Sequence, residues 1–175
     1  MEILDVYNAA GELMGTLERG RAHAKDAGVY HKCVYIWVIN SSGEVLLEQR
    51  ALCKSNPGKW DTGVVEHAWT GETMLEACVR GVREELGVET SEDEYIFINE
   101  TLNGFGWEFR IHYVLYKDIA LGDMDLQENE VAQVKWLSLD EYKQFICTDA
   151  FIVHTREYKD FVVREIEAAF NKLKV

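Results

Sequence analysis

Two adjacent glutamates, Glu84 and Glu85, are the residues of this chain whose type and spacing first suggest chemistry. They lie in the segment GVVEHAWTGETMLEACVRGVREELGV, residues 63–88, within a helix that we predict over 72–86. Residues three and four apart are neighbours on a helix, so position 81 lies beside both glutamates. Paired carboxylates on a rigid helix repel each other unless a cation lies between them, and hard oxygen ligands suit Mg2+ or Mn2+. Taken alone, the pair also fits a solvated acidic edge whose charge is offset by neighbouring arginines.

The wider pattern around these glutamates is similar to a known motif. The stretch GETMLEACVRGVREELGV resembles the Nudix box, written G-x5-E-x7-R-E-U-x-E-E-x-G-U, in which U is an apolar residue. The positions that match at the right spacing are Glu72, Arg80, Val82, Glu84, Glu85, Gly87 and Val88. Two positions depart from the motif, because Glu66 stands in place of the first glycine and Gly81 in place of a glutamate. The resemblance covers roughly residues 30–145.

Glycine and glutamate are thus exchanged between two positions of the motif. In Nudix proteins the loop with the first glycine lies against the helix with the glutamates, so we expect Glu66 to extend into the space beside Gly81. This would restore the number of carboxylates and would explain a glycine that costs a helix about 1 kcal/mol relative to alanine. The alternative is decay, in which a metal ligand was lost at position 81. Helix propensity alone predicts that replacing Gly81 stabilises the fold by roughly 0.5–1 kcal/mol.

The resemblance implies both a fold and an activity. The expected fold is an α/β/α sandwich with a mixed β-sheet, and the expected activity is hydrolysis of a diphosphate bond in a nucleoside diphosphate derivative or a similar small molecule. Mg2+, for which Mn2+ can substitute, would be bound by Glu66, Glu84 and Glu85. The ion would polarise the phosphate and activate a water molecule.

Other acidic and basic residues are expected to support this site. The resemblance implies that Glu72 is an auxiliary metal group and that Arg80 pairs with Glu84 one helical turn away. A further acid often comes from the loop before the last strand, where Glu130 is the candidate and Glu128 lies behind it. A solvated loop acid is the alternative for both.

Two cations precede the NPGKW loop. Arg50 and Lys54 are four residues apart near the end of a predicted strand. Arginine binds phosphate oxygens through a planar fork and lysine acts as a point charge, so both are candidate substrate-binding residues. The alternative is that they are ordinary surface cations.

The same stretch also resembles isopentenyl-diphosphate isomerase, a relative with the same fold that binds a metal through histidines. The corresponding positions are His31, His67 and, one residue off in spacing, His23. Val65 stands in place of the catalytic cysteine and cannot transfer a proton. Glu108 matches one of two later glutamates, but Arg110 stands in place of the other. Isomerase activity is therefore the alternative function, with His67 kept as a candidate at the substrate site; a catalytically silent binding protein follows if the exchange is decay.

Strands and two long helices must position these residues within a single α/β domain. We divide the chain into an N-terminal hairpin and connector over 1–29, a core over 30–147 and a C-terminal helix within 148–175. Alternation and turn residues predict strands in YHKCVYIWVIN, EVLLEQRA, YIFINETL, WEFRIHYVLY and VAQVKWL, with NGFG as a hairpin turn. Gly87 should end the helix over 72–86, and Ser138 should cap another. A helix over about 149–173 presents an apolar stripe to the core or to a second copy of the chain, which leaves a homodimer open.

Composition limits the partners. The net charge is −13, from 31 acidic and 18 basic residues, and such a surface repels nucleic-acid polymers. The apolar runs are too short for a membrane span, and MEILDVYNAAGE lacks the features of a signal peptide. The four cysteines show no CxxC spacing, which favours reduced thiols and a cytoplasmic location.

Overall fold

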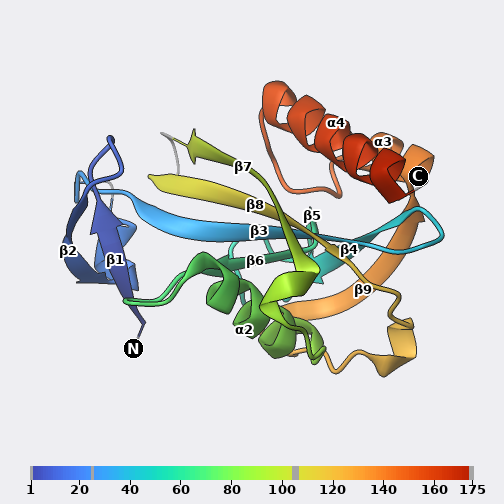
Figure 1. Cartoon of the computed structure of the whole chain (residues 1–175), viewed down its shortest axis with the longest axis horizontal. Helices are drawn as coiled ribbons and strands as arrows, with labels where there is room; N and C mark the ends of the chain where they lie inside the picture. Colours follow the sequence, from blue (N-terminus) through green and yellow to red (C-terminus); the bar gives the residue numbers. More distant parts are fainter. Residues whose placement is uncertain (1, 25, 104–106, 174–175) are drawn as a thin grey trace.

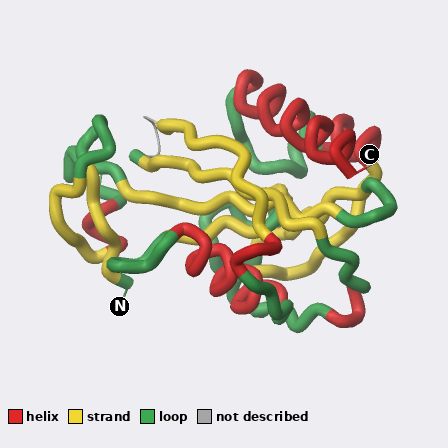
Figure 2. Tube along the Cα trace, viewed as in Figure 1, coloured by secondary structure: helices red, strands yellow, loops and turns green. Residues whose placement is uncertain are grey.

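A mixed seven-stranded sheet with helices on both faces forms the body of the molecule (Figures 1 and 2). The computed structural model describes residues 2–24, 26–103 and 107–173. The strand bounds are β1 Ile3–Tyr7, β2 Leu13–Glu18, β3 His31–Ile39, β4 Glu44–Arg50, β5 Trp60–Thr62, β6 Val64–His67, β7 Tyr95–Asn103, β8 Glu108–Tyr116 and β9 Val131–Ser138. The helices are α1 Arg19–Ala22, α2 Met74–Leu86, α3 Leu139–Phe145 and α4 Arg156–Leu173, with short 3-10 turns at Glu92–Glu94 and Leu121–Asp123. This α/β architecture confirms the fold class predicted from the sequence.

The order of the strands opens a gap beside β3. The main path is β5-β4-β3-β8-β7, with β6 paired to β3 and β9 paired to β4. β3 runs parallel to β8 along one edge. On its other edge, β3 pairs with β6 from Cys33 to Ile36 and with β4 only at Ile39. The strands β6 and β4 therefore share one edge of β3 and part from each other, which leaves room for a pocket between them.

Alternation along β3 directs its side chains into two cores. Val34, Ile36 and Val38 are buried with the apolar face of α2, whereas Trp37 and Ile39 are buried with residues of α3 and α4. Successive residues of a strand point to opposite faces, so one continuous apolar run supplies both layers. Figure 1 shows α2 on one side of the sheet and α3 with α4 on the other.

The N-terminal hairpin β1–β2 forms a separate two-stranded sheet at one end of the molecule (Figure 1). Its small apolar cluster contains Leu4, Val6 and Ala22. Bridges from Leu4 to Trp69 and from Tyr7 to Tyr30 tie it to the rest of the chain. The predicted NGFG turn lies mostly outside the described residues, because 104–106 are not described.

The C-terminal helix begins later than the sequence pattern predicts. It starts at Arg156 rather than near residue 149. The reason is a non-local pairing with β5, in which the amide of Trp60 donates to the carbonyl of Ala150 and the amide of Ile152 donates to the carbonyl of Trp60. These bonds hold the chain extended where side-chain periodicity alone predicted helix. The buried residues Val162 and Ile166 then pack α4 on the sheet.

No helix in the described part of the chain combines the length and the apolar composition that a membrane crossing requires.

Candidate active site

Helix α2 holds the motif glutamates in place through both of its ends. Thr73 accepts a hydrogen bond from the amide of Glu76, while the Glu76 carboxylate accepts one from the amide of Thr73, which makes a capping box. Gly87 ends the helix in the left-handed conformation with φ 67°, as predicted. Between these ends, Glu85 is 7% exposed and the side chain of Glu84 is 38% exposed. One motif glutamate is therefore buried and its neighbour faces the solvent.

Glu66 and Gly81 lie against each other. A Cβ atom added at position 81 would be 2.9 Å from Cβ of Glu66, 3.2 Å from its Cγ and 3.3 Å from Val64 Cγ1. The first distance is shorter than real side chains adopt, and Cβ of Glu66 cannot rotate away. The space that glycine leaves beside α2 is thus occupied by the stem of Glu66, as the exchange hypothesis requires; whether Glu66 binds a metal stays a prediction. This collision acts against the stabilisation that helix propensity predicts for replacing Gly81, and the net effect on stability stays a prediction.

Arg80 connects the acidic residues. Its Nε and Nη2 donate to the two carboxylate oxygens of Glu72 at 2.8 and 2.9 Å, a bidentate pair. Its Nη1 lies 3.2 Å from an oxygen of Glu66 and 3.2 Å from one of Glu84, the partner expected one turn away. The Trp69 ring packs over the guanidinium, with Cζ 3.8 Å from the ring centre. Arg80 therefore holds three carboxylates at once: Glu72 at Nε and Nη2, and Glu66 and Glu84 at Nη1.

Glu48 is a site residue that the motif comparison missed. It lies on β4, is 6% exposed, and its Oε2 has no hydrogen-bond partner within the described residues. Burial, followed by the charge of Asp61, raises the pKa of Glu48 to about 8. Burial, followed by the charge of Glu48, raises the pKa of Glu85 well above its usual value. One sequence signal could have found it, since Glu48 interrupts an apolar strand on the side of Leu46, the side that faces α2.

Two buried carboxylates that face each other need a proton or a cation between them. Glu48 and Glu85 line the same pocket as Glu66 and Glu84. One oxygen of Glu48 has no partner among the described residues, and the pKa of Glu85 is raised. A set of carboxylate oxygens is the donor chemistry that Mg2+ and Mn2+ prefer. The residues present therefore fit a divalent cation.

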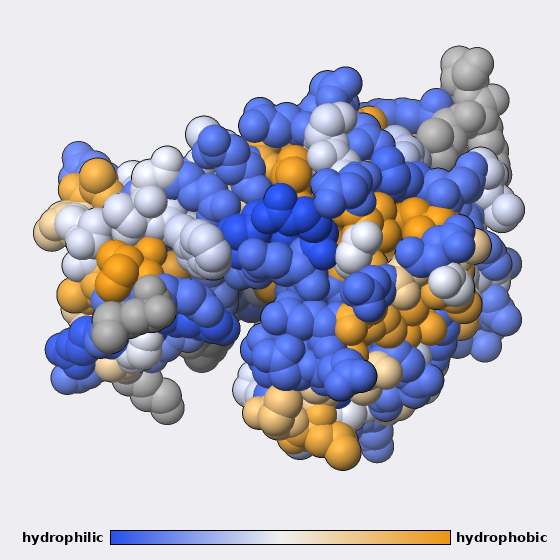
Figure 3. All heavy atoms as spheres, turned by 90° about the horizontal axis from the view of Figure 1, so that it is seen from below, coloured by the Kyte–Doolittle hydropathy of each residue, from blue (hydrophilic) through white to orange (hydrophobic). Residues whose placement is uncertain are grey.

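The pocket between β6 and β4 has a volume of about 570 Å³. Its acidic lining residues are Glu2, Glu48, Asp61, Glu66, Glu84, Glu85, Glu108 and Glu130. Its basic lining residues are Arg19, Arg50, Lys54, Arg80 and Arg110. Hydrophilic side chains also cover the middle of the face seen in Figure 3, where a notch separates the N-terminal part from the rest of the surface.

The other predicted site residues lie at the rim. Lys54 forms an ion pair with Glu130. Arg50 donates from Nε to the carbonyl of Ser55 at 2.7 Å and from Nη2 to its hydroxyl at 3.1 Å. All three of Arg50, Lys54 and Glu130 line the pocket, whereas Glu128 is not among its lining residues.

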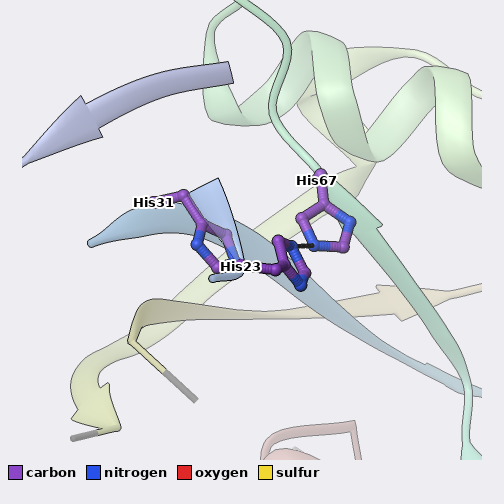
Figure 4. A group of neighbouring side chains, drawn as sticks. All are labelled: His23, His31 and His67. Atoms are coloured by element: carbon purple, nitrogen blue, oxygen red, sulfur yellow. Dashed lines mark hydrogen bonds between the residues drawn. The ribbon is translucent and has the colours of Figure 1, made fainter. Parts of the chain in front are cut away.

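Three histidines meet in the fold (Figure 4), and two of them, His23 and His67, line the same pocket. Nε2 of His23 and Nε2 of His67 are 3.0 Å apart, and the stacked rings of His23 and His31 have centres 4.4 Å apart. Neither ring nitrogen of His31 has a partner within the part of the chain that is described. Burial, followed by the nearby His23, lowers the pKa of His31 to about 4, so this ring is neutral at pH 7. One nitrogen from each ring lies within 4.8 Å of the others, and neutral imidazoles in such a group suit a transition-metal ion.

In the sequence comparison, His23 is one residue off the spacing of the isomerase histidines, yet in the structure it belongs to this group. The three rings come from α1's end, β3 and β6, and only the folded sheet brings them together. Val65, in place of the isomerase cysteine, pairs with Tyr35 across β3 and β6.

Comparison with known proteins identifies relatives of this chain. The family model for the NUDIX domain matches residues 29–154. Nudix hydrolase 3 of Arabidopsis thaliana is 29% identical over 98% of this chain, which spans only 23% of that protein. An uncharacterized Nudix hydrolase of Listeria monocytogenes is 30% identical over 87% of this chain and 89% of its own length. Isopentenyl-diphosphate Delta-isomerase of Escherichia coli is 41% identical, over 53% of this chain and 50% of the isomerase.

Solved structures share the fold. A protein of Deinococcus radiodurans superposes with a TM-score of 0.71 at 24% identity, covering 93% of this chain and 98% of that one. The NUDIX domain of NrtR from Shewanella oneidensis, solved with ADP ribose, superposes with a TM-score of 0.57 at 14% identity, covering 80% of this chain and 88% of that one.

Proposed function

The chain belongs to the Nudix family, and from that premise we propose that it is a hydrolase that uses a divalent cation to cleave the diphosphate bond of a nucleoside diphosphate derivative or a similar small molecule. The observation that carries this proposal is the buried pair Glu48 and Glu85, which lies in one pocket with Glu66 and has an oxygen without a partner among the described residues. A pair of this kind is costly unless a cation is bound, so the pocket is suited to a metal and not only to water.

Each residue has a separate task in this mechanism. Glu48, Glu66, Glu84 and Glu85 would hold Mg2+ or Mn2+, and the bound ion would polarise a phosphate and lower the pKa of a water. Arg80 orients Glu66 and Glu84. Arg50 and Lys54, at the rim, would offset phosphate charge, and His67 would line the substrate's path.

The test is a phosphate-release screen with the purified chain. Nucleoside diphosphate derivatives are supplied with Mg2+, and ADP ribose is included because the Shewanella domain was solved with it. We expect at least one compound to be hydrolysed, and hydrolysis to stop in excess chelator. Hydrolysis of none, or hydrolysis that persists in chelator, would contradict the proposal.

The histidine cluster favours a second candidate, an isomerase-like activity on isopentenyl diphosphate. Val65 in place of the cysteine and Arg110 in place of a glutamate argue against it, because neither can exchange a proton at carbon. We expect no conversion between isopentenyl and dimethylallyl diphosphate. Detectable conversion by the purified chain would replace the hydrolase with this alternative.

A silent binding protein is the third possibility. It would bind a diphosphate ligand in the same pocket without turnover, so a screen in which ligands bind and no phosphate appears would identify it. A homodimer and a cytoplasmic location remain predictions from the sequence.

A further inference from the structure

Arg110 lies on the side of the pocket away from the helix with the carboxylates. In the sheet, Cys33 pairs with His67 of β6 on one side and with Arg110 of β8 on the other, so these three residues form one row. Successive strand residues point to opposite faces, and Glu66 precedes His67. Glu66 faces α2, where it contacts Gly81, and Arg110 therefore belongs to the opposite face. A ligand that contacts both Glu66 and Arg110 must therefore have two separate groups, one for each face of the sheet.

The Arg110 side chain is held on three sides. Its Nε donates to Glu108 Oε1 at 2.6 Å. The rings of Tyr35 and Tyr158 lie beside the guanidinium, with their centres 5.2 and 4.8 Å from Cζ. The Tyr35 hydroxyl donates to the same oxygen of Glu108 at 3.1 Å. Arg110 is thus fixed before any ligand arrives, which lowers the entropy cost of using it for recognition.

The terminal nitrogens of Arg110 differ from those of the other pocket cations. Neither Nη1 nor Nη2 of Arg110 has a hydrogen bond or ion pair with any residue in the described ranges, although the side chain is only 14% exposed. Arg80 uses both of its terminal nitrogens on protein oxygens, Lys54 is paired with Glu130, and Arg19 with Glu2. A largely buried guanidinium with two unused donor groups favours an acceptor supplied by a ligand.

We propose that Arg110 selects the substrate by donating from Nη1 and Nη2 to acceptor oxygens on the group attached to the diphosphate. This proposal rests on the proposed function, and it narrows the substrate class to molecules with two polar ends. One end is the diphosphate at the carboxylates, and the other presents oxygens to a planar fork, as a nucleobase carbonyl edge or a further phosphate does. A diphosphate that carries only a hydrocarbon would leave the fork of Arg110 without a partner.

The experiment measures the binding of non-hydrolysable analogues by calorimetry with Mg2+ present. Methylenediphosphonate supplies the diphosphate mimic alone, αβ-methylene-UDP adds a base with carbonyl oxygens, and αβ-methylene-ATP adds a third phosphate and a base without carbonyl oxygens. The proteins are the wild type, Arg110→Met, Arg110→Lys and the control Arg164→Met. Arg164 carries the same charge on α4 but pairs locally with Glu165 and does not line the pocket.

We expect Arg110→Met to weaken binding of at least one nucleotide analogue by about tenfold or more, the usual effect of losing a charged hydrogen-bonded pair. Binding of methylenediphosphonate should not change, and Arg110→Lys should give an intermediate loss because it keeps the charge and not the fork. The analogue that responds identifies the source of the oxygens. Arg164→Met should match the wild type throughout.

Several results would overturn the assignment: an equal loss for all three analogues, no loss for any, or no binding to the wild type. If Arg110→Met does not fold, as judged by thermal unfolding, Arg110→Lys decides alone. Because the analogues are not cleaved, binding is read independently of turnover. A chain that binds in the expected pattern but releases no phosphate would refute the proposed function and leave the role of Arg110 in place.

Discussion

At the scale of single residues, the pocket is organised by carboxylates that the fold buries against their preference. Burial and the charge of Asp61 raise the pKa of Glu48, burial and the charge of Glu48 raise the pKa of Glu85, and Glu66 lies against Gly81 and Arg80. The Nudix motif predicted Glu84, Glu85 and the closeness of Glu66 to Gly81. It could not predict Glu48, because this residue lies in another strand and meets Glu85 only in the folded chain.

The exchange between Glu66 and Gly81 can be tested as a double-mutant cycle. Gly81→Ala alone should lower the free energy of unfolding, because the new Cβ would collide with Glu66. In a Glu66→Gly background only the 3.3 Å approach to Val64 Cγ1 remains, so Gly81→Ala should destabilise the fold much less than it does with Glu66 present, or stabilise it by up to about 1 kcal/mol. Denaturant unfolding of the four proteins measures both effects. Equal effects of Gly81→Ala in the two backgrounds would contradict the contact.

Activity should follow the same exchange. Glu66→Gln should reduce hydrolysis about as strongly as Glu85→Gln does, since both would remove a metal ligand. The double change Glu66→Gly with Gly81→Glu returns the carboxylate to the helix and should recover much of the rate. Turnover at the wild-type level in Glu66→Gln would show that Glu66 is not a ligand.

Stability should depend on pH in the absence of metal. The folded-state pKa of Glu48 is about 8 against an ordinary 4.5, so the folded state holds a proton that the unfolded state releases. The free energy of unfolding should therefore fall as pH rises through this range. The window above about pH 7.5 is the informative one, because the ordinary pKa of 6.5 leaves His31 largely neutral there even in the unfolded state, as it is in the folded state. Below it, the lowered pKa of this histidine makes stability change in the opposite direction.

The measurement is the melting temperature in chelator between about pH 7.5 and 8.5. The melting temperature of the wild type should decrease across this window, and that of Glu48→Gln should decrease less. Added Mg2+ should raise the wild-type melting temperature most at the upper end of the window, where the carboxylates are ionised. A flat profile in the wild type would argue against a strained carboxylate pair.

At the scale of elements, α2 positions the site because both of its ends are fixed by residues that the sequence reveals. The stop at Gly87 and the Ser138 cap were predicted correctly, since caps are local signals. The start of α4 was predicted incorrectly, because the segment before it pairs with β5, which lies more than eighty residues earlier in the chain. The histidine cluster was only partly predicted for the same reason: it needs neighbours from three separate elements.

Gly87, at the end of α2, lies against Asp125 in the segment that leads to Glu130. A Cβ at this position would need a left-handed backbone and would lie 2.6 Å from Cβ of Asp125. Gly87→Ala should therefore destabilise the fold by roughly 1–3 kcal/mol. The matched control is Gly122→Ala, where a Cβ would meet open space, with an expected change within about 0.5 kcal/mol. Equal melting temperatures for the two variants would contradict this account of the helix end.

At the scale of the whole molecule, the fold gathers acidic residues from distant parts of the sequence into one pocket. The chain has a net charge of −13, and eight of its carboxylates line one pocket. Composition alone could describe this charge only as a solubilising surface. The strand order explains the difference, because β6 and β4 part beside β3 and direct their acids toward α2.

These carboxylates are expected to bind a divalent cation, and calorimetric titration with Mg2+ measures that binding. Mg2+ prefers oxygen ligands, so the histidine cluster should not contribute to the signal. We expect the wild type and the control Glu128→Gln, which lies outside the pocket, to bind Mg2+ alike. Glu85→Gln and Glu66→Gln should each bind roughly tenfold more weakly or worse. Wild-type affinity in Glu85→Gln, or no Mg2+ binding to the wild type, would contradict the account.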